Sequence, residues 1–600
     1  MKPTMKSTEY DDISGKHLDD KVVLRILPYL KPHRLLFLFT LLLVFVSAGV
    51  SLFTPKLLGL MVDRALVPHN HILLIRLCAL YGVLEVVRLV CIFTQSFHLQ
   101  STGQAVMLAI RQDLFAKLTH MPMIFFDHNP VGKLVTRVTN DTVNLSELFS
   151  ANFVMLLSDI LLIVGVIVAM LLLHVKMGLL VLSVFPLMIY AMTYFAQHLR
   201  IAFRNSREVL ARLNSFFAER MSGMPIVQLM EREAHEKRRF SKISEEYRAR
   251  QFEGVYLYSL FHPTITVLSG ASIVMVILFA PRFIHLGEIG LGTLISFLAY
   301  SQVLYQPVRN ITDRYNVFLQ AMSSAERIFT LMDMEEEANL REPVPDNSLT
   351  LSGALEFRNV HFSYYSQQSK QRLPALKEVS FSVQPGEKVA VIGHTGAGKT
   401  TITSLLFRFY DVDQGQIFLD GKEIREIPKN LLRRKIGFVQ QDVFLFSGSL
   451  RENLRLLNED ASDAEIMAAC QITGFNKVMQ RSNFNLDSLL DERGSNLSFG
   501  ERQILAFTRV CLQKPDLLIL DEATSSVDRA SEQLIHHAAD ALTRNRTSLI
   551  IAHRMETVLS ADRILVLEKG RLLEEGSHSQ LLSKNGVYAR FAHLQTESHP

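Results

Sequence analysis

This 600-residue sequence has few cysteines and a small net charge. The four cysteines, Cys78, Cys91, Cys470 and Cys511, form no CxxC pair and no spacing that suits zinc, so neither a disulfide framework nor a zinc site is expected. The net charge is only +4, which gives no basis for nucleic-acid binding. Residues 1–21 are polar and acidic, unlike a secretory signal or a transit peptide.

Hydrophobic residues make up 48% of the chain and charged residues 20%, but they are unevenly distributed. Long apolar runs recur up to about residue 320, whereas the pattern beyond about residue 350 is that of a globular protein. A chain of this length also exceeds what one core organises. We therefore expect a cytosolic N-terminus with an amphipathic helix over 1–34, an all-α transmembrane domain over 35–320, a linker over 321–354 and an α/β domain over 355–595.

Six apolar segments can each cross a hydrocarbon layer about 30 Å thick, which takes roughly 20 helical residues. They are 35–60, 73–97, 148–173, 177–197, 258–284 and 291–317. Positive charge indicates the cytosolic side, and the loop 199–255 carries twelve Lys and Arg. Both chain ends and the loops 98–147 and 199–257 are therefore predicted to be cytosolic.

The two long cytosolic loops keep a helical period, so the spans should continue into the cytosol as helices. Each loop is broken once, at 121–134 and at 221–230, where proline and glycine interrupt the helical pattern. These breaks are either simple hairpin turns or docking points for a domain beneath the membrane.

Three charged residues fall inside the predicted spans. Glu85 and Arg88 lie three residues apart on one helix face, which favours mutual neutralisation over contact with a transported compound. Asp159 has no such neighbour, so we expect it to face a central cavity rather than lipid.

The soluble half contains a phosphate-binding motif. Residues 387–409 have the pattern of a strand, a glycine loop and a helix, and GHTGAGKT matches G-x-x-x-x-G-K-[ST] from Gly393 to Thr400. In this motif the backbone N–H groups cradle phosphates, Lys399 neutralises the β and γ oxygens, and the Thr400 hydroxyl binds magnesium. ATP and Mg²⁺ are therefore the predicted cofactors.

A second half-motif follows in DLLILDEATSSVD (516–528). Its apolar run predicts a buried strand that ends in Asp521, where magnesium should lie. Glu522 comes next and is placed to orient the attacking water.

The order of the remaining motifs narrows the class of nucleotide-binding protein to which the chain could belong. Tyr364 precedes the glycine loop, and Gln441 in FVQQDVFLF, NLSFGERQ (496–503) and His553 in SLIIAHR follow it. In this order the chain resembles an ATP-binding cassette (ABC) exporter half-transporter, from about residue 20 to 595. The segment FFDHNPVGKLVTRVTND (125–141) resembles that family's first coupling region, which favours docking for the helix breaks. Among the branches of the family, the chain looks most like bacterial multidrug-resistance-like half-transporters that work as unequal pairs.

The resemblance implies roles within the chain's own nucleotide site. Tyr364 would stack on adenine, Glu522 would be the general base and His553 would contact the γ-phosphate. Gln441 would sense magnesium and the attacking water. The phosphates would be wrapped by Gly393, His394, Thr395, Gly396, Ala397, Gly398, Lys399, Thr400 and Thr401. The magnesium ligands would be Thr400, Gln441 and Asp521.

The resemblance also implies roles across a dimer interface. Asp528 would cross that interface, and Ser498 and Gly500 would bind ATP held by the other subunit. The family's usual signature is LSGGQ, from which this chain departs at two of five positions. Phe499 adds bulk where a backbone should approach phosphate, and the Glu501 carboxylate would oppose a γ-phosphate.

The same stretch has a purely local interpretation, because Ser498-x-x-Glu501 is a capping box at a helix start. If the altered signature is impaired, the favoured partner is a second half-transporter with an intact signature. If Phe499 points away and Glu501 acts only as a capping acid, a homodimer is functional instead.

The predicted function is ATP-driven efflux of a lipophilic or amphipathic compound, a drug or a lipid, across the bacterial inner membrane. One alternative is a membrane protein whose ATPase domain gates a partner without vectorial transport. A lipid or peptide exporter is a further alternative.

Overall fold

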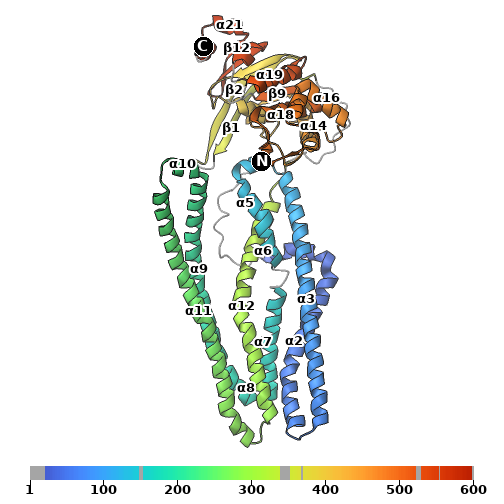
Figure 1. The fold of residues 1–600 in the computed structure, drawn as a ribbon, viewed down its shortest axis with the longest axis vertical. Helices are drawn as coiled ribbons and strands as arrows, with labels where there is room; N and C mark the ends of the chain where they lie inside the picture. Colours follow the sequence, from blue (N-terminus) through green and yellow to red (C-terminus); the bar gives the residue numbers. More distant parts are fainter. Residues whose placement is uncertain are drawn as a thin grey trace. The chain divides into compact units, whose positions relative to one another are not determined.

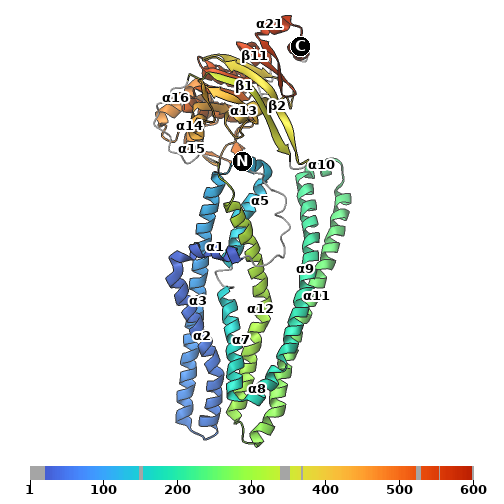
Figure 2. The same cartoon turned by 180° about the vertical axis from the view of Figure 1, so that it is seen from behind.

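The computed structural model describes residues 20–147, 153–337, 352–366, 369–521, 529–552 and 555–597 (Figures 1 and 2). Its contacts divide the chain into two compact units. The first unit comprises Met1–Leu118 with Gly132–Met334, and the second comprises Thr119–Val131 with Glu335–Pro600. The short segment 119–131, which contains most of the first predicted helix break, therefore belongs with the C-terminal unit.

The first unit is built from helices. The α-helices are α1 (Asp20–Leu30), α2 (Arg34–Met61), α3 (His71–Thr119), α5 (Val131–Thr136), α6 (Thr142–Glu147), α7 (Phe153–Leu173), α8 (Val175–Leu182), α9 (Phe185–Ser222), α10 (Met224–Leu229), α11 (Glu233–His285) and α12 (Leu291–Met332). Short 3₁₀ or π turns are η1 (Lys31–His33), η2 (Val62–Leu66) and η3 (Arg137–Asp141). Helices α9 and α11 run side by side in both views.

Five helical segments among the described residues are long and apolar enough to cross a membrane. They are Leu24–Leu66, His71–Thr119, Val154–Leu173, Val175–Ser222 and Glu233–His285. The predicted span 291–317 forms part of α12, which is not among these five, so a total of six spans stays a prediction.

Several spans continue as long helices, as the helical period predicts. Helix α3 extends to Thr119, and α9 and α11 extend to either side of the second break, which contains the short helix α10. The predicted span 177–197 is interrupted between α8 and α9. Pro186 stands in the first turn of α9. The helix is interrupted just before it, because proline cannot donate the backbone hydrogen bond that a continuous helix requires.

Each of the three charged residues in the predicted spans has an oppositely charged neighbour in the structure. Arg88 pairs with Glu85 at 2.7 Å, so the predicted mutual neutralisation is confirmed. Asp159 is buried, and its Oδ2 lies 3.0 Å from Nε of Arg314 on α12. A cation far along the chain therefore neutralises this carboxylate, and the expectation that Asp159 faces a central cavity stays a prediction.

The second unit contains the strands. A four-stranded antiparallel sheet has the order β2 (Gln371–Val383), β1 (Leu355–Ser366), β4 (Gln414–Leu419), β5 (Lys422–Glu423). A six-stranded sheet has the order β12 (Arg571–Gly576), β11 (Arg563–Glu568), β3 (Lys388–Ile392), β10 (Thr547–Ile551), β9 (Leu517–Asp521), β6 (Ile436–Val439). A two-stranded ribbon joins β7 (Gly448–Ser449) to β8 (Leu489–Leu490).

The six-stranded sheet positions the nucleotide motifs. Its strands are parallel except for β12, which pairs with β11 in the antiparallel sense. Residue Ile551 of β10 faces Val391 of β3 on one side and Asp521 of β9 on the other. The carboxyl ends of β3 and β9 therefore lie on the same sheet edge, where α/β proteins bind ligands.

The second unit also contains helices, most of which contribute residues to two buried clusters with the sheets. They are α4 (Met123–His128), α13 (Lys399–Leu406), α14 (Lys429–Lys435), α15 (Leu450–Arg455), α16 (Asp463–Thr473), α17 (Phe475–Arg481), η5 (Glu492–Gly494), α18 (Phe499–Gln513), α19 (Arg529–Thr543), α20 (Met555–Leu559), α21 (His578–Ser583) and α22 (Val587–Glu597). A helical unit with long apolar helices followed by an α/β unit agrees with the predicted fold class.

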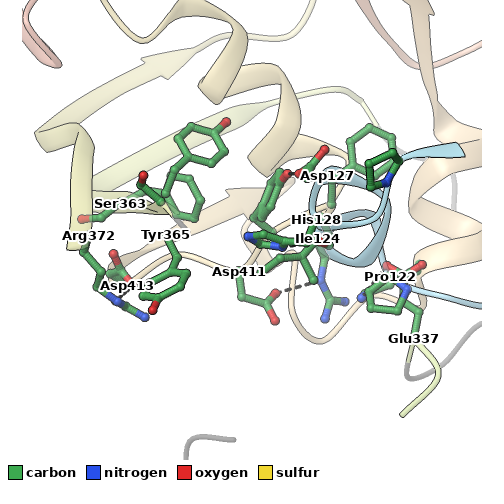
Figure 3. A pocket seen from close by; sticks show the side chains of 18 residues that line it. Pro122, Ile124, Asp127, His128, Glu337, Ser363, Tyr365, Arg372, Asp411 and Asp413 are labelled. Atoms are coloured by element: carbon green, nitrogen blue, oxygen red, sulfur yellow. Dashed lines mark hydrogen bonds and ion pairs between the residues drawn. The ribbon is translucent and has the colours of Figure 1, made fainter. Parts of the chain in front are cut away.

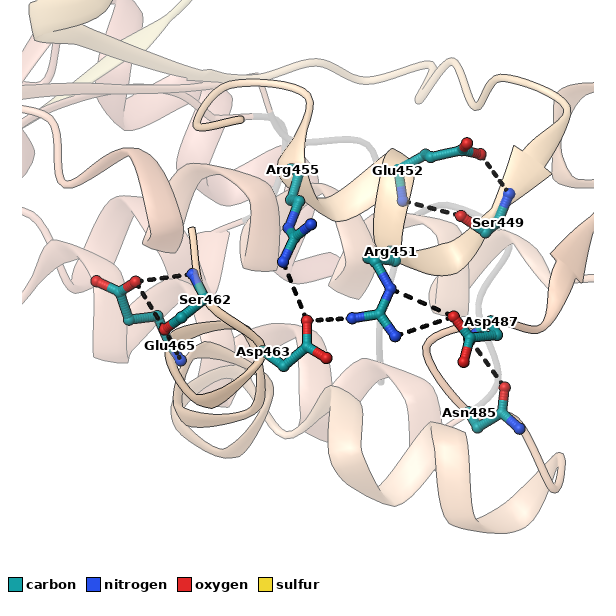
Figure 4. Close-up of polar contacts among 9 residues, drawn as sticks. All are labelled: Ser449, Arg451, Glu452, Arg455, Ser462, Asp463, Glu465, Asn485 and Asp487. Atoms are coloured by element: carbon teal, nitrogen blue, oxygen red, sulfur yellow. Dashed lines mark hydrogen bonds and ion pairs between the residues drawn. The ribbon is translucent and has the colours of Figure 1, made fainter. Parts of the chain in front are cut away.

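Polar contacts join α15 to α16 and to the loop before β8 (Figure 4). Arg451 donates to Asp463 and, at 2.9 Å, to Asp487, while Arg455 donates to Asp463 at 3.0 Å. Capping boxes begin both helices, with Ser449 on α15 and Ser462 on α16. These contacts order the helical layer in which α18 is packed.

Candidate nucleotide site

The glycine loop between β3 and α13 has a backbone that only glycine adopts easily. Gly393, Gly396 and Gly398 have φ angles of 154°, 81° and 107°. A Cβ on Gly393 would lie 2.2 Å from the Leu567 carbonyl oxygen, so a larger residue cannot fit there. His394, Thr395, Gly396 and Thr400 are exposed, so this backbone is open to an incoming phosphate.

Lys399 is buried at the start of α13, and the loop itself satisfies its ammonium group. Its Nζ donates to the carbonyl oxygens of Gly393 at 2.5 Å and His394 at 3.2 Å. Burial lowers the pKa of Lys399, and the neighbouring Asp521 carboxylate opposes this effect. A phosphate that replaces the two carbonyl contacts would add negative charge beside this buried cation.

Three predicted magnesium ligands line one cavity of about 480 Å³, which we call the phosphate-side cavity. They are Thr400 of α13, Gln441 after β6 and Asp521 at the end of β9. Burial raises the pKa of Asp521, and Lys399 opposes this rise. Hydroxyl, amide and carboxylate oxygens are the donors that Mg²⁺ prefers, so these residues fit the ion.

The described residues contain no cluster of three or more His, Cys, Asp or Glu side chains that could hold a metal.

Tyr364 lies on β1 within a group of aromatic rings. Its ring contacts Phe362 edge-on at 4.8 Å and Tyr410 edge-on at 5.3 Å, and its hydroxyl donates to Thr401 Oγ1 at 3.4 Å. Tyr364 and Tyr410 line a second cavity of about 760 Å³, the base-side cavity. Figure 3 shows Asp127 and neighbouring residues of α4 along one part of this cavity.

The signature stretch begins α18 as a complete capping box. Ser498 Oγ accepts from the Glu501 backbone N–H at 3.3 Å, and the Glu501 carboxylate accepts from the Ser498 N–H at 2.8 Å. Gly500 is buried and Phe499 is half-buried at the first helical position. The local interpretation of this stretch is therefore confirmed, and Glu501 places a negative charge at the helix N-terminus.

The predicted residues Glu522, Asp528 and His553 lie outside the described residues. The described part of the site brings Thr400, Gln441 and Asp521 to one cavity, and it places Tyr364 beside Thr401. Ser498 and Gly500 are on α18 rather than among the residues that line the phosphate-side cavity.

Sequence reasoning missed a buried cation that supports the site. Arg509 of α18 donates to the Asn453 carbonyl oxygen at 2.6 Å, to Asn453 Oδ1 at 2.7 Å and to the Phe444 carbonyl oxygen at 2.9 Å. Burial lowers its pKa to about 10. Gln503 of the same helix donates to the Gln441 carbonyl oxygen at 3.3 Å. The available signal was an arginine as the one charged residue of the mostly apolar run ILAFTRVCL (504–512).

The fold and the site together define a phosphate-loop ATPase fused to membrane helices. Two family models match this chain, the ABC transporter transmembrane region over 37–308 and the ABC transporter domain over 376–525. The chain belongs to the ABC transporter family and has the composition of a half-transporter, with one transmembrane region and one ATP-binding domain. It is therefore an ATPase coupled to transport.

Relatives align over most of the chain. The uncharacterised ABC transporter ATP-binding protein YknV of Bacillus subtilis is 34% identical over 98% of this chain and 96% of its own length. The probable multidrug resistance ABC transporter ATP-binding/permease protein YheH of the same species is 33% identical over 87% of this chain and 77% of its own. The ATP-dependent lipid A-core flippase of Syntrophus aciditrophicus is 32% identical over 84% of this chain and 83% of its own.

Proposed function

We propose that this chain is one half of an exporter that moves a lipophilic or amphipathic compound, a drug or a lipid, across the bacterial inner membrane. The observation that carries the proposal is the convergence of Thr400, Gln441 and Asp521 on one cavity, in a chain that also has long apolar helices. The multidrug and lipid A-core names of two relatives support this substrate class. Six spans, with both chain ends in the cytosol, complete the proposed topology.

In this proposal the site residues divide the binding of the base, the phosphates and the metal. Tyr364 stacks on the base, and the loop from Gly393 to Thr401 holds the phosphates. Thr400, Gln441 and Asp521 hold Mg²⁺, which when bound neutralises charge on the phosphate oxygens. Lys399 exchanges its two loop carbonyls for phosphate oxygens, a step that the observed contacts support.

Three residues outside the described part complete the proposed chemistry. Glu522 accepts the proton of the attacking water, His553 contacts the γ-phosphate, and Asp528 lies at the interface with the partner. Glu522→Gln should preserve ATP binding while slowing steady-state hydrolysis by about 100- to 10,000-fold, because it removes the general base. Hydrolysis at the wild-type rate in the assembled transporter would refute the assignment of Glu522.

The partner is proposed to be a different half-transporter with an intact signature. Ser498 and Gly500 would meet the ATP held by that partner, and Glu501 would then bring a carboxylate towards its γ-phosphate. Phe499 and Glu501, the two departures from LSGGQ, support this proposal, because the Glu501 charge lies at the helix N-terminus, where its carboxylate accepts from the Ser498 N–H at 2.8 Å.

The same contact favours a second candidate, a homodimer in which Glu501 acts only as a capping acid. The test is the ATPase rate of the chain purified alone and with a candidate partner. A heterodimer predicts a slow isolated chain that accelerates with the partner or with Phe499→Gly combined with Glu501→Gln. Brisk hydrolysis by the isolated chain, changed by neither addition, would establish the homodimer.

Export itself is tested in inverted membrane vesicles. The dye Hoechst 33342 and a fluorescent phospholipid represent the drug and lipid classes of substrate. ATP-dependent uptake of either probe, abolished by Glu522→Gln, would support vectorial transport. ATP hydrolysis without movement of either probe would instead favour a membrane regulator that gates a partner.

A further inference from the structure

The base-side cavity connects the nucleotide motifs to helix α4 through one tyrosine. The Tyr410 ring lies 5.3 Å from the Tyr364 ring at an interplanar angle of 85°, and 5.5 Å from the Phe362 ring. Its hydroxyl donates a hydrogen bond to the Asp127 carboxylate of α4. Tyr410 therefore contacts the proposed base-stacking residue with its ring and α4 with its hydroxyl.

Helix α4 is a compact turn whose C-terminal carbonyl groups bond to its own side chains. Asn129 Nδ2 donates to the Phe125 carbonyl oxygen at 2.9 Å, and His128 Nδ1 lies 2.6 Å from the Ile124 carbonyl oxygen. Phe125 is buried, while Asp127 keeps part of its surface in solvent. Partial burial raises the pKa of Asp127, and the charge of His128 opposes this rise.

The Tyr364 hydroxyl makes its 3.4 Å contact with Thr401 of the phosphate loop. A base that stacks on Tyr364 fixes the plane of that ring, and a ring packed edge-on against it must adjust to keep contact. Because the Tyr410 hydroxyl donates to Asp127 of α4, any such adjustment of the Tyr410 ring acts on α4 through this hydrogen bond.

We propose that Tyr410 is a positioning residue that transmits occupancy of the base site from Tyr364 to α4 through its hydrogen bond to Asp127. The inference rests on the proposed base-stacking role of Tyr364. It adds that α4 responds to the base of the nucleotide, and not to the phosphates alone.

The test exploits the absence of tryptophan from the sequence. Phe126→Trp places one indole on α4, next to Asp127, and its emission reports the surroundings of that helix. The full-length chain in nanodiscs is titrated with ATP, with ADP and with inorganic tripolyphosphate, which has phosphates but no base. The relay predicts an emission change with ATP and ADP and little change with tripolyphosphate.

Three substitutions in the reporter background separate the hydrogen bond from the ring and the charge. Tyr410→Phe keeps the ring, so the affinity for ATP should stay within about twofold while the emission change falls at least about fivefold. Asp127→Ala should cause the same loss. Asp127→Asn keeps an oxygen acceptor for the hydroxyl and should preserve the response. Tyr365→Phe, which removes a hydroxyl from a neighbouring exposed tyrosine, is the matched control and should leave the response unchanged.

Four results would overturn the relay. They are no ATP response from the reporter, an equal response to tripolyphosphate, a full response in Tyr410→Phe, and a loss in Tyr365→Phe as large as that in Tyr410→Phe. The proposed function is tested separately, by the affinity of Tyr364→Ala for ATP. Unchanged affinity in that variant would refute base stacking, and with it the first step of the relay.

Discussion

Replacing Arg509 with methionine should destabilise the ATP-binding domain more than any exposed substitution on the same subdomain. The guanidinium donates three hydrogen bonds, of 2.6, 2.7 and 2.9 Å, to oxygens of Asn453 and Phe444. Methionine fills similar space but donates none of them. The substitution therefore removes three hydrogen bonds, two of them buried, although Asn453 Oδ1 still accepts from the Phe446 N–H at 3.0 Å.

The magnitude follows from those contacts. Leaving a buried polar group unsatisfied costs about 1–3 kcal/mol, and breaking a buried charged network costs about 3–5 kcal/mol in total. For a domain of this size, each kcal/mol lowers Tm by roughly 2–4 °C. We therefore expect Arg509→Met to lower Tm by about 6–20 °C. Arg509→Lys keeps the charge but loses the planar fork, so its effect should be intermediate.

The assay is thermal unfolding of the full-length protein with and without ATP. The unfolding transition whose Tm rises with ATP belongs to the ATP-binding domain, because a ligand stabilises the fold that binds it. Arg481→Met, on the exposed end of α17, is the matched control and should shift Tm by only about 1–2 °C. An Arg509→Met variant that melts with the control, and hydrolyses ATP at the wild-type rate, would refute the reasoning.

Gly398→Ala should abolish binding of a trinitrophenyl ATP analogue, because φ is 107° and a Cβ would lie 2.7 Å from a leucine side chain; Gly396→Ala, where the Cβ meets open space, should weaken binding less, and equal binding by both would contradict this. Asp159→Ala should destabilise the membrane unit by about 3–5 kcal/mol, because it leaves the Arg314 cation without its partner. Adding Arg314→Ala should restore thermal stability, and a double variant as unstable as Asp159→Ala would contradict the ion pair. Burial raises the pKa of the Cys470 thiol to about 12, so it stays protonated at about pH 8; mass spectrometry should find it unmodified by iodoacetamide in the native protein, and rapid labelling would count against its burial.

Some of this protein is determined by short stretches of its sequence. The strand, glycine loop and helix around Lys399 can be predicted because adjacent residues supply the turn, the cation and the helix start. The pairing of Glu85 with Arg88 and the capping box of Ser498 follow from separations of three residues. In each case helix geometry alone fixes the distance between the partners.

The remaining contacts depend on packing between segments that are remote in the chain. Tyr410 and Asp127 are 283 residues apart, and no local pattern relates them. Arg314 reaches Asp159 only because α12 packs against α7, and no local pattern predicted this ion pair. Sequence periodicity shows which face of a helix is apolar, but it does not show which distant helix will cover that face or supply a counter-charge. Only the tertiary structure decides those pairings, because they require the segments to be packed together before the side chains can meet.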